Sequence, residues 1–187
     1  MTDDPGETPE TAEERMARRR LERQRTIAYL DLAEARGPVP LLDDDAIAGV
    51  LRSARRIAVV GASSNAARPS FGVFRYLLQH GYDCVPINPA EQSVSGVPAF
   101  PTLRAAVDAT GPFDLVDVFR RSELCPAHAR EAVEIGARCL WLQLGVVSWE
   151  AARIAHEGGL SVVMDRCTAI EHRRMRGSLT GEGQSPT

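Results

Sequence analysis

Short apolar segments alternate with amphipathic segments through the central part of the chain. Runs rich in β-branched and other apolar residues occupy positions 57–60, 82–87, 114–119, 139–144 and 160–164. Between several of them, apolar residues recur at helical spacing: Phe71, Phe74 and Leu78, then Cys125, Ala129, Ala132 and Val133, then Ala151, Ile154 and Ala155. Almost continuously apolar strands that alternate with helices form a parallel sheet with both faces covered. The pattern predicts an α/β fold with a doubly wound, parallel, five-stranded sheet.

Three glycines follow the predicted helices of this domain. Gly81, Gly136 and Gly158 each stand where a helical segment should stop. Helices commonly end on a glycine in the left-handed conformation, so we expect that conformation at all three.

The first part of the chain has a different composition. Residues 10–36 are dense in Glu and Arg and contain no Gly or Pro, which predicts an extra N-terminal helix. Its apolar residues are too sparse for a wide core-facing stripe, which favours a solvated helix with ion pairs four residues apart. The alternative is a contact with a protein partner or a second copy through Ile27, Tyr29 and Leu30. Residues 43–53 predict a second, short helix.

These patterns divide the chain into three parts. Residues 1–37 form a charged N-terminal extension, residues 38–176 form the α/β domain, and residues 177–187 form a flexible polar tail.

Composition narrows the functional classes. The chain has 187 residues, 44% of them hydrophobic and 25% charged, as in a globular domain with a full core. A net charge of −3 argues against binding to duplex nucleic acid, and no apolar run reaches the roughly 18 to 20 residues that span a bilayer. The polar N-terminus and four scattered cysteines favour a cytoplasmic protein with reduced thiols. All 22 basic residues are arginine, which excludes a phosphate-loop lysine and a Schiff-base lysine.

The segment after the first predicted strand is rich in hydrogen-bond donors. Gly61 permits a tight turn there, and the small Ala62 and Ser63 let a ligand approach the backbone. Ser64 and Arg68 add donors, and the N-terminus of the following helix favours an anion. The segment predicts a phosphate-binding loop; the alternative is an ordinary strand-to-helix connection with solvated serines.

The same segment disfavours a nicotinamide dinucleotide site. The dinucleotide motif G-x-G-x-x-G would need glycines where Ser63 and Ala66 stand. The second strand is followed by Asn88 and Pro89 instead of the acidic residue that holds the ribose, and Glu91 is the nearest acid.

The other strand ends add polar candidates. The third strand is followed by Arg120 and Arg121, which suit an anionic group or an adenine face, or pair with nearby carboxylates. Gln143 either faces the crevice or is buried with partners, and Cys167 follows the fifth strand. Because ligands bind beyond the carboxyl ends of parallel strands, we expect one cleft rimmed by Ser63, Ser64, Arg68, Asn88, Arg120, Gln143 and Cys167.

The sequence gives weak support for catalysis. The four histidines lie apart, and none stands beside a serine or cysteine that it could activate. No zinc-ligand spacing is present. The pattern favours binding of a phosphorylated ligand over bond breaking.

Five motifs, in the same order, resemble the small bacterial CoA-binding proteins. They are IAVVGAS at 57–63, PINP at 86–89, DVFRR at 117–121, WLQLG at 141–145 and VVMDRC at 162–167. The resemblance runs from about residue 45 to 175. More distantly, the chain is similar to the CoA-binding domain of the succinyl-CoA synthetase α subunit.

The resemblance implies a Rossmann-like fold that binds coenzyme A without an accompanying catalytic domain. It implies contacts from Gly61, Ala62, Ser63 and Ser64 on the phosphate side, Asn88 and Pro89 after the second strand, and Val118, Phe119 and Arg120 beside the adenosine and pantetheine. The synthetase has a basic residue after the second strand, where this chain has Asn88 and Glu91. That difference leaves the phosphates to Arg68 and Arg120.

We therefore interpret the chain as a cytoplasmic module that binds coenzyme A or an acyl-CoA in a non-catalytic or regulatory role, without nucleic acid, membrane or metal. One alternative is a small NAD(P)-dependent oxidoreductase. Another is a CoA-dependent acyl transferase with Cys167 as nucleophile; Cys167 could also form a mixed disulfide with CoA on oxidation.

Overall fold

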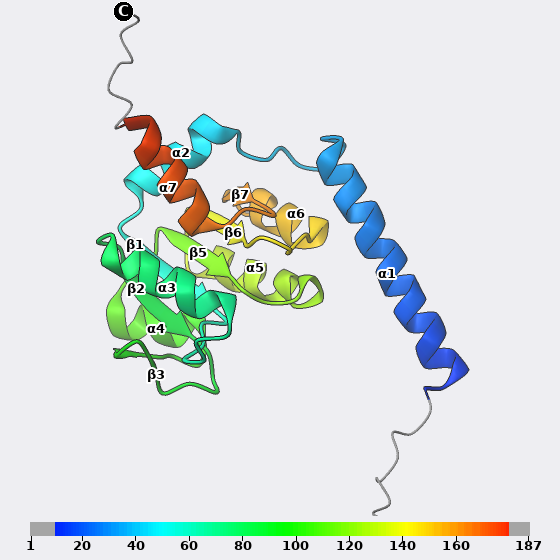
Figure 1. Ribbon diagram of the computed structural model, residues 1–187, viewed down its shortest axis with the longest axis horizontal. Coiled ribbons are helices and arrows are strands. Elements are labelled where there is room, and N and C mark those ends of the chain that lie inside the picture. Colours follow the sequence, from blue (N-terminus) through cyan, green and yellow to red (C-terminus); the bar gives the residue numbers. More distant parts are fainter. Residues whose placement is uncertain (1–9, 180–187) are drawn as a thin grey trace, which may run out of the picture. The chain divides into compact units, whose positions relative to one another are not determined.

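Five parallel strands form the central sheet of the computed structural model, which describes residues 10–179 (Figure 1). The strands are β1 (Arg56–Val60), β2 (Asp83–Ile87), β5 (Leu115–Val118), β6 (Cys139–Leu142) and β7 (Ser161–Val163), arranged in the order β2-β1-β5-β6-β7. The five predicted strands and the doubly wound Rossmann-like fold are confirmed. Since the chain goes from β1 to β2 and then returns to place β5 on the other side of β1, the strand order reverses between β1 and β5. Ligands of such sheets bind at this reversal.

Helices cover both faces of the sheet (Figure 1). One layer consists of α2 (Asp44–Ser53), α3 (Pro69–Gln79) and α7 (Thr168–Leu179), with α2 and α3 both packed on α7. The other layer consists of α4 (Leu103–Thr110), α5 (Cys125–Glu134) and α6 (Trp149–Glu157), with a 3₁₀ turn, η1 (Ser122–Leu124), before α5. A small hairpin, β3 (Ser93–Val94) and β4 (Val97–Pro98), follows β2. The sequence did not predict α4, α7 or the hairpin.

The core lies between the sheet and the helices. Ile57 and Val59 of β1, Leu115 of β5 and Phe74 of α3 are fully buried. Trp141 of β6 is also fully buried, and its indole N–H donates to the backbone oxygen of Arg166 at 2.6 Å. The apolar runs of the sequence are therefore the strands of a sheet buried on both faces.

The glycines at the helix ends differ from one another. Gly81 and Gly136 have the expected left-handed conformation, with φ of 85° and 70°. The expectation for Gly158 is wrong, because its φ is −80° and the left-handed residue is Gly159. Gly158 instead allows close packing against α5, because a Cβ atom there would lie 2.3 Å from a methyl carbon of Val133.

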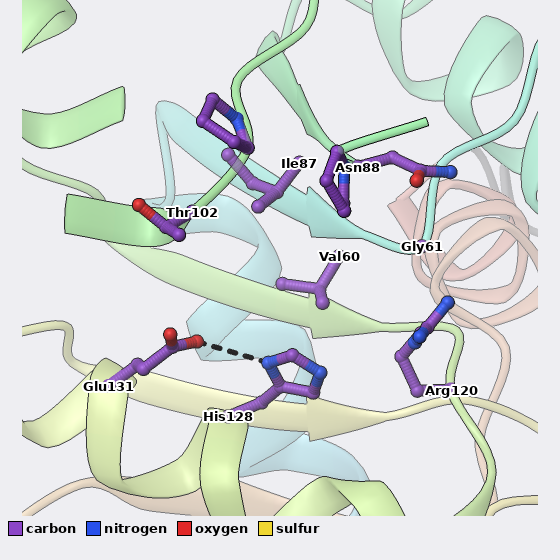
Figure 2. Close-up of a pocket in the computed structure, with 10 residues that line it drawn as sticks. Val60, Gly61, Ile87, Asn88, Thr102, Arg120, His128 and Glu131 are labelled. Atoms are coloured by element: carbon purple, nitrogen blue, oxygen red, sulfur yellow. Dashed lines mark hydrogen bonds and ion pairs between the residues drawn. The ribbon is translucent and has the colours of Figure 1, made fainter. Parts of the chain in front are cut away.

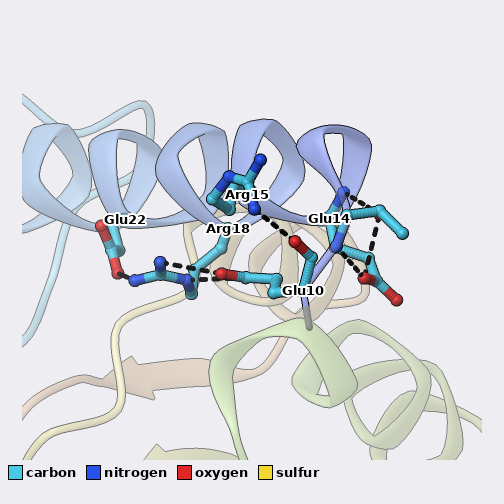
Figure 3. A network of polar contacts seen from close by, with 6 residues as sticks. Glu10, Glu14, Arg15, Arg18 and Glu22 are labelled. Carbon is cyan, nitrogen blue, oxygen red and sulfur yellow. Dashed lines mark hydrogen bonds and ion pairs between the residues drawn. The ribbon is translucent and has the colours of Figure 1, made fainter. Parts of the chain in front are cut away.

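The N-terminal part forms a compact unit of its own, Met1–Gly37, separate from Pro38–Thr187. Its helix α1 (Ala12–Ala33) confirms the predicted extra helix and begins with a capping box between Thr11 and Glu14. Arg18 pairs with Glu22 four residues later and with Glu10 (Figure 3). None of the residues of α1 is buried. Its contact with a partner stays a prediction.

Two further expectations concern the C-terminal tail and membrane-spanning helices. The flexible tail was expected from residue 177, but α7 continues to Leu179, and residues 180–187 lie outside the described residues. Within residues 10–179, no helix combines the length and the apolar character needed to cross a membrane.

Candidate functional site

A cavity of about 150 Å³ opens at the carboxyl ends of β1 and β2, next to the segment after β5 (Figure 2). Four residues named from the sequence line it together: Gly61, Asn88, Pro89 and Arg120. The remaining lining residues are Val60, Ile87, Pro101, Thr102, His128 and Glu131. The cavity therefore lies at the reversal of strand order, with a mainly apolar wall and a few polar groups.

Gly61 brings the first loop close to the chain after β5. Its φ is 82°, and its N–H donates to the backbone oxygen of Ile87 at 2.9 Å. A Cβ atom at this position would lie 2.6 Å from the backbone oxygen of Phe119 and 2.9 Å from the side chain of Arg120. Both the conformation and the close approach require glycine here.

The donors of the predicted phosphate loop hold a carboxylate of the chain itself. One oxygen of Glu91 accepts from the backbone N–H of Ser64 at 2.9 Å and from the hydroxyl of Ser63 at 3.1 Å. The backbone hydrogen bond from Ser64 is the main cause that lowers the pKa of Glu91. The loop thus holds a carboxylate of the chain itself, and binding of a phosphate there stays a prediction.

Asn88 connects the first loop to the segment after β2. Its side-chain N–H donates to the backbone oxygen of Ala62 at 2.8 Å, and its side-chain oxygen accepts from the N–H of Ala90 at 3.0 Å. Its backbone N–H donates to Phe100 at 2.9 Å. These hydrogen bonds fix the two loops on either side of the cavity opening.

The two arginines assigned to phosphate neutralisation occupy different positions. Arg120 lines the cavity, and within residues 10–179 its guanidinium has no hydrogen-bond partner. Arg68 is the exposed N-cap residue of α3, outside the cavity wall, and its guanidinium likewise has no partner among the described residues. Donors are therefore available at the cavity and farther along the loop.

Gln143 is buried beside the site instead of facing the opening. Its side-chain N–H donates to Asp117 at 2.8 Å and lies 2.7 Å from the hydroxyl of Thr168. The Thr168 hydroxyl donates to Asp117 at 3.0 Å. Asp117 is completely buried, and burial raises its pKa to about 7, against the opposing effect of these hydrogen bonds. The amide of Gln143 thus joins β6 to β5 and α7.

The other sequence candidates lie outside the cavity wall. Ala62 and Val118 are fully buried, and Phe119 packs half-buried against the core. Cys167 is half-buried in the segment between β7 and α7 and does not line the cavity. The thiols of Cys84, Cys125 and Cys139 are buried, which raises the pKa of each.

Three polar residues of the cavity wall were not named as site residues from the sequence. Thr102 caps α4, and His128 and Glu131 project from α5. The Nδ1 atom of His128 lies 3.0 Å from a carboxylate oxygen of Glu131 (Figure 2). Their spacing of three residues, which puts both on one helix face, was the available signal. Within residues 10–179, no group of three or more His, Cys, Asp or Glu side chains is placed to hold a metal ion.

Comparison with known proteins identifies the family of the α/β domain. Residues 55–173 match the model of a family described as CoA binding domain. The uncharacterized protein YneT of Bacillus subtilis (strain 168) is 39% identical over 123 residues, which are 66% of this chain and 89% of YneT. A hypothetical protein from Pyrococcus horikoshii OT3 is 35% identical, with a TM-score of 0.69 over 73% of this chain and 94% of its own. A Thermus thermophilus structure is 34% identical, with a TM-score of 0.66 over 72% of this chain and 99% of its own. The chain therefore belongs to the CoA binding domain family.

Proposed function

We propose that this protein binds coenzyme A or an acyl-CoA in the cytoplasm, as a stand-alone module with a non-catalytic or regulatory role. The family match supports CoA binding in general. The observation that carries the proposal is the shared cavity, because Gly61, Asn88, Pro89 and Arg120 come from three strand ends and line one space.

The chemistry of the residues fits the ligand. Coenzyme A carries a diphosphate and a 3′-phosphate, which need fixed N–H groups and guanidinium donors. The Ser64 backbone N–H already holds the carboxylate of Glu91, so the loop can stabilise an anion. The cavity is smaller than the roughly 300–1,000 Å³ of pockets that enclose a whole drug-sized ligand. The cavity suits a single ring system of coenzyme A, and the phosphates would then lie outside the cavity along residues 61–68.

Isothermal titration calorimetry with coenzyme A tests the proposal. We expect saturable binding to one site per chain, with weaker binding of 3′-dephospho-CoA. Arg120→Ala and Arg68→Ala should each weaken binding about tenfold, as expected for hydrogen bonds to charged groups. Arg153→Ala is the matched control, since Arg153 is exposed on α6 and pairs with Glu157. An absence of saturable binding to the unmodified protein would refute the proposal.

Titration with acetyl-CoA under the same conditions separates the two ligand forms. A higher affinity for the thioester would indicate an acyl-CoA module. Unaltered acetyl-CoA after prolonged incubation is expected for a protein without catalysis, and its hydrolysis or transfer would contradict that part of the proposal.

A further inference from the structure

His128 and Glu131 form a hydrogen-bonded pair on the wall of the cavity, and the binding role proposed above does not yet use them. Both belong to α5, and their side chains extend from it toward Thr102 and Val60 (Figure 2). The imidazole lies below Val60, between Glu131 and Arg120 in this view. Only about a fifth of the His128 side chain is exposed, 22%. The ring is therefore held in place at the cavity and is not a mobile surface group.

The hydrogen bond determines which nitrogen of His128 can receive a ligand. A carboxylate only accepts hydrogen bonds, so the Nδ1 atom that contacts Glu131 at 3.0 Å must carry the proton. In the neutral imidazole, the Nε2 atom is then an acceptor. No hydrogen bond engages Nε2 within residues 10–179. When the imidazole is neutral, the pair presents Nε2 as one acceptor of fixed direction.

The rest of the wall favours a flat heterocycle. Val60, Ile87, Pro89 and Pro101 contribute apolar surface, and the volume of about 150 Å³ suits a single ring system. Thr102 already accepts a hydrogen bond from the N–H of Ala105 at 3.1 Å, so its hydroxyl hydrogen remains available as a donor. The cavity therefore combines an acceptor at His128 with donors at Thr102 and Arg120.

Adenine has the complementary pattern. Its exocyclic amine is a donor, and the adjacent ring nitrogens are acceptors. A base with a carbonyl in place of the amine would bring two acceptors together at Nε2 and lose the hydrogen bond.

We propose that His128, held in one tautomer by Glu131, accepts a hydrogen bond from the exocyclic amine of adenine and makes this cavity selective for the adenine ring of coenzyme A. The inference rests on the proposed function, and it assigns base selectivity to this pair. His128 is a specificity residue, and Glu131 is a positioning residue that acts through it.

The test compares coenzyme A with deamino-CoA, in which hypoxanthine replaces adenine at nearly the same size. By calorimetry we expect the unmodified protein to bind deamino-CoA about tenfold more weakly than coenzyme A. His128→Phe keeps a flat ring of similar size but removes the acceptor. This variant should bind coenzyme A more weakly, and its preference for coenzyme A over deamino-CoA should fall to less than about twofold. His128→Ala gives a second measurement if the larger ring disturbs the wall.

Two further variants separate positioning from packing. Glu131→Gln retains an acceptor for the Nδ1 proton and should keep most of the preference, whereas Glu131→Ala should lose it. His156→Ala is the matched control, because His156 is exposed on α6 and does not line the cavity. This variant should change neither the affinity for coenzyme A nor the affinity for deamino-CoA.

The outcomes distinguish this inference from the proposed function. Failure of the unmodified protein to bind coenzyme A overturns both. Binding of coenzyme A and deamino-CoA with equal affinity overturns only the adenine assignment. A full preference that persists in both His128 variants overturns the role of His128.

Discussion

At the scale of single residues, Glu91 places a negative charge on the candidate phosphate loop. Its carboxylate occupies the Ser64 N–H and the Ser63 hydroxyl, which are the donors that a phosphate would use. A bound phosphate must therefore displace or repel this carboxylate. Glu91→Gln retains an acceptor for the loop but removes the negative charge, so we expect it to bind coenzyme A about three- to tenfold more tightly.

Calorimetry at two salt concentrations measures this effect. The gain from Glu91→Gln should shrink at higher salt, because salt screens the repulsion between the Glu91 carboxylate and a bound phosphate. Glu157→Gln, on the exposed side of α6, removes the same charge from a carboxylate paired with Arg153 and should leave the affinity unchanged. Equal or weaker binding by Glu91→Gln would show that Glu91 does not compete with the ligand.

Part of the site was predictable because parallel strands end at one edge of a sheet. That rule placed Asn88 and Arg120 at one cleft, and both line the cavity, whereas Ser63, Ser64, Arg68, Gln143 and Cys167 do not. The position of Gln143 was not predictable, since its partners Asp117 and Thr168 are 26 and 25 residues away along the chain. Sequence alternation identifies a strand face, but it does not show whether a polar side chain there meets a buried partner or an open cleft.

At the scale of elements, predictability followed the length and apolar content of each segment. The five strands of the parallel sheet are almost wholly apolar, and all of them were predicted. Helix α4 has only eight residues and buries only Leu103 and Ala106. Helix α7 has a polar sequence. Its buried residues include Glu171 and His172, and each of these has a specific polar partner. Glu171 pairs with Arg166 at 3.0 Å, and the imidazole of His172 lies 3.0 Å from the Tyr76 hydroxyl. Hydrophobic periodicity cannot reveal a helix stabilised in this way.

The contact between α5 and α6 gives a prediction at the same scale. A Cβ atom on Gly158 would lie 2.3 Å and 2.7 Å from the two methyl carbons of Val133. Gly158→Ala should therefore lower the free energy of unfolding by about 1 to 3 kcal/mol, measured by urea denaturation. Val133→Ala removes those methyl groups, so the double variant should be more stable than the sum of the single changes predicts. Strict additivity would show that the two residues do not clash.

At the scale of the whole molecule, Asp117 joins three elements at the centre of the domain. It lies on β5 and accepts hydrogen bonds from Gln143 after β6 and from Thr168 at the start of α7. Burial raises its pKa from an ordinary value of 3.8 to about 7 in the folded protein. Between these two values the folded state binds more protons than the unfolded state. The contribution of Asp117 protonation to the free energy of unfolding is therefore complete below pH 3.8 and is lost as the pH rises to about 7.

Asp117→Asn removes this titration and should alter the pH dependence of the entire domain. Between pH 5 and pH 8, the free energy of unfolding of the unmodified protein should fall relative to the variant by about 2 to 3 kcal/mol. His172 has a lowered pKa, caused mainly by burial, and contributes with the opposite sign below its ordinary value of 6.5. Since His172 is present in both proteins, its contribution cancels in their difference. Urea denaturation followed by tryptophan fluorescence provides both curves. Parallel curves across this range would mean that Asp117 does not take up a proton on folding, and that its three hydrogen-bonded elements stay together around a permanent carboxylate.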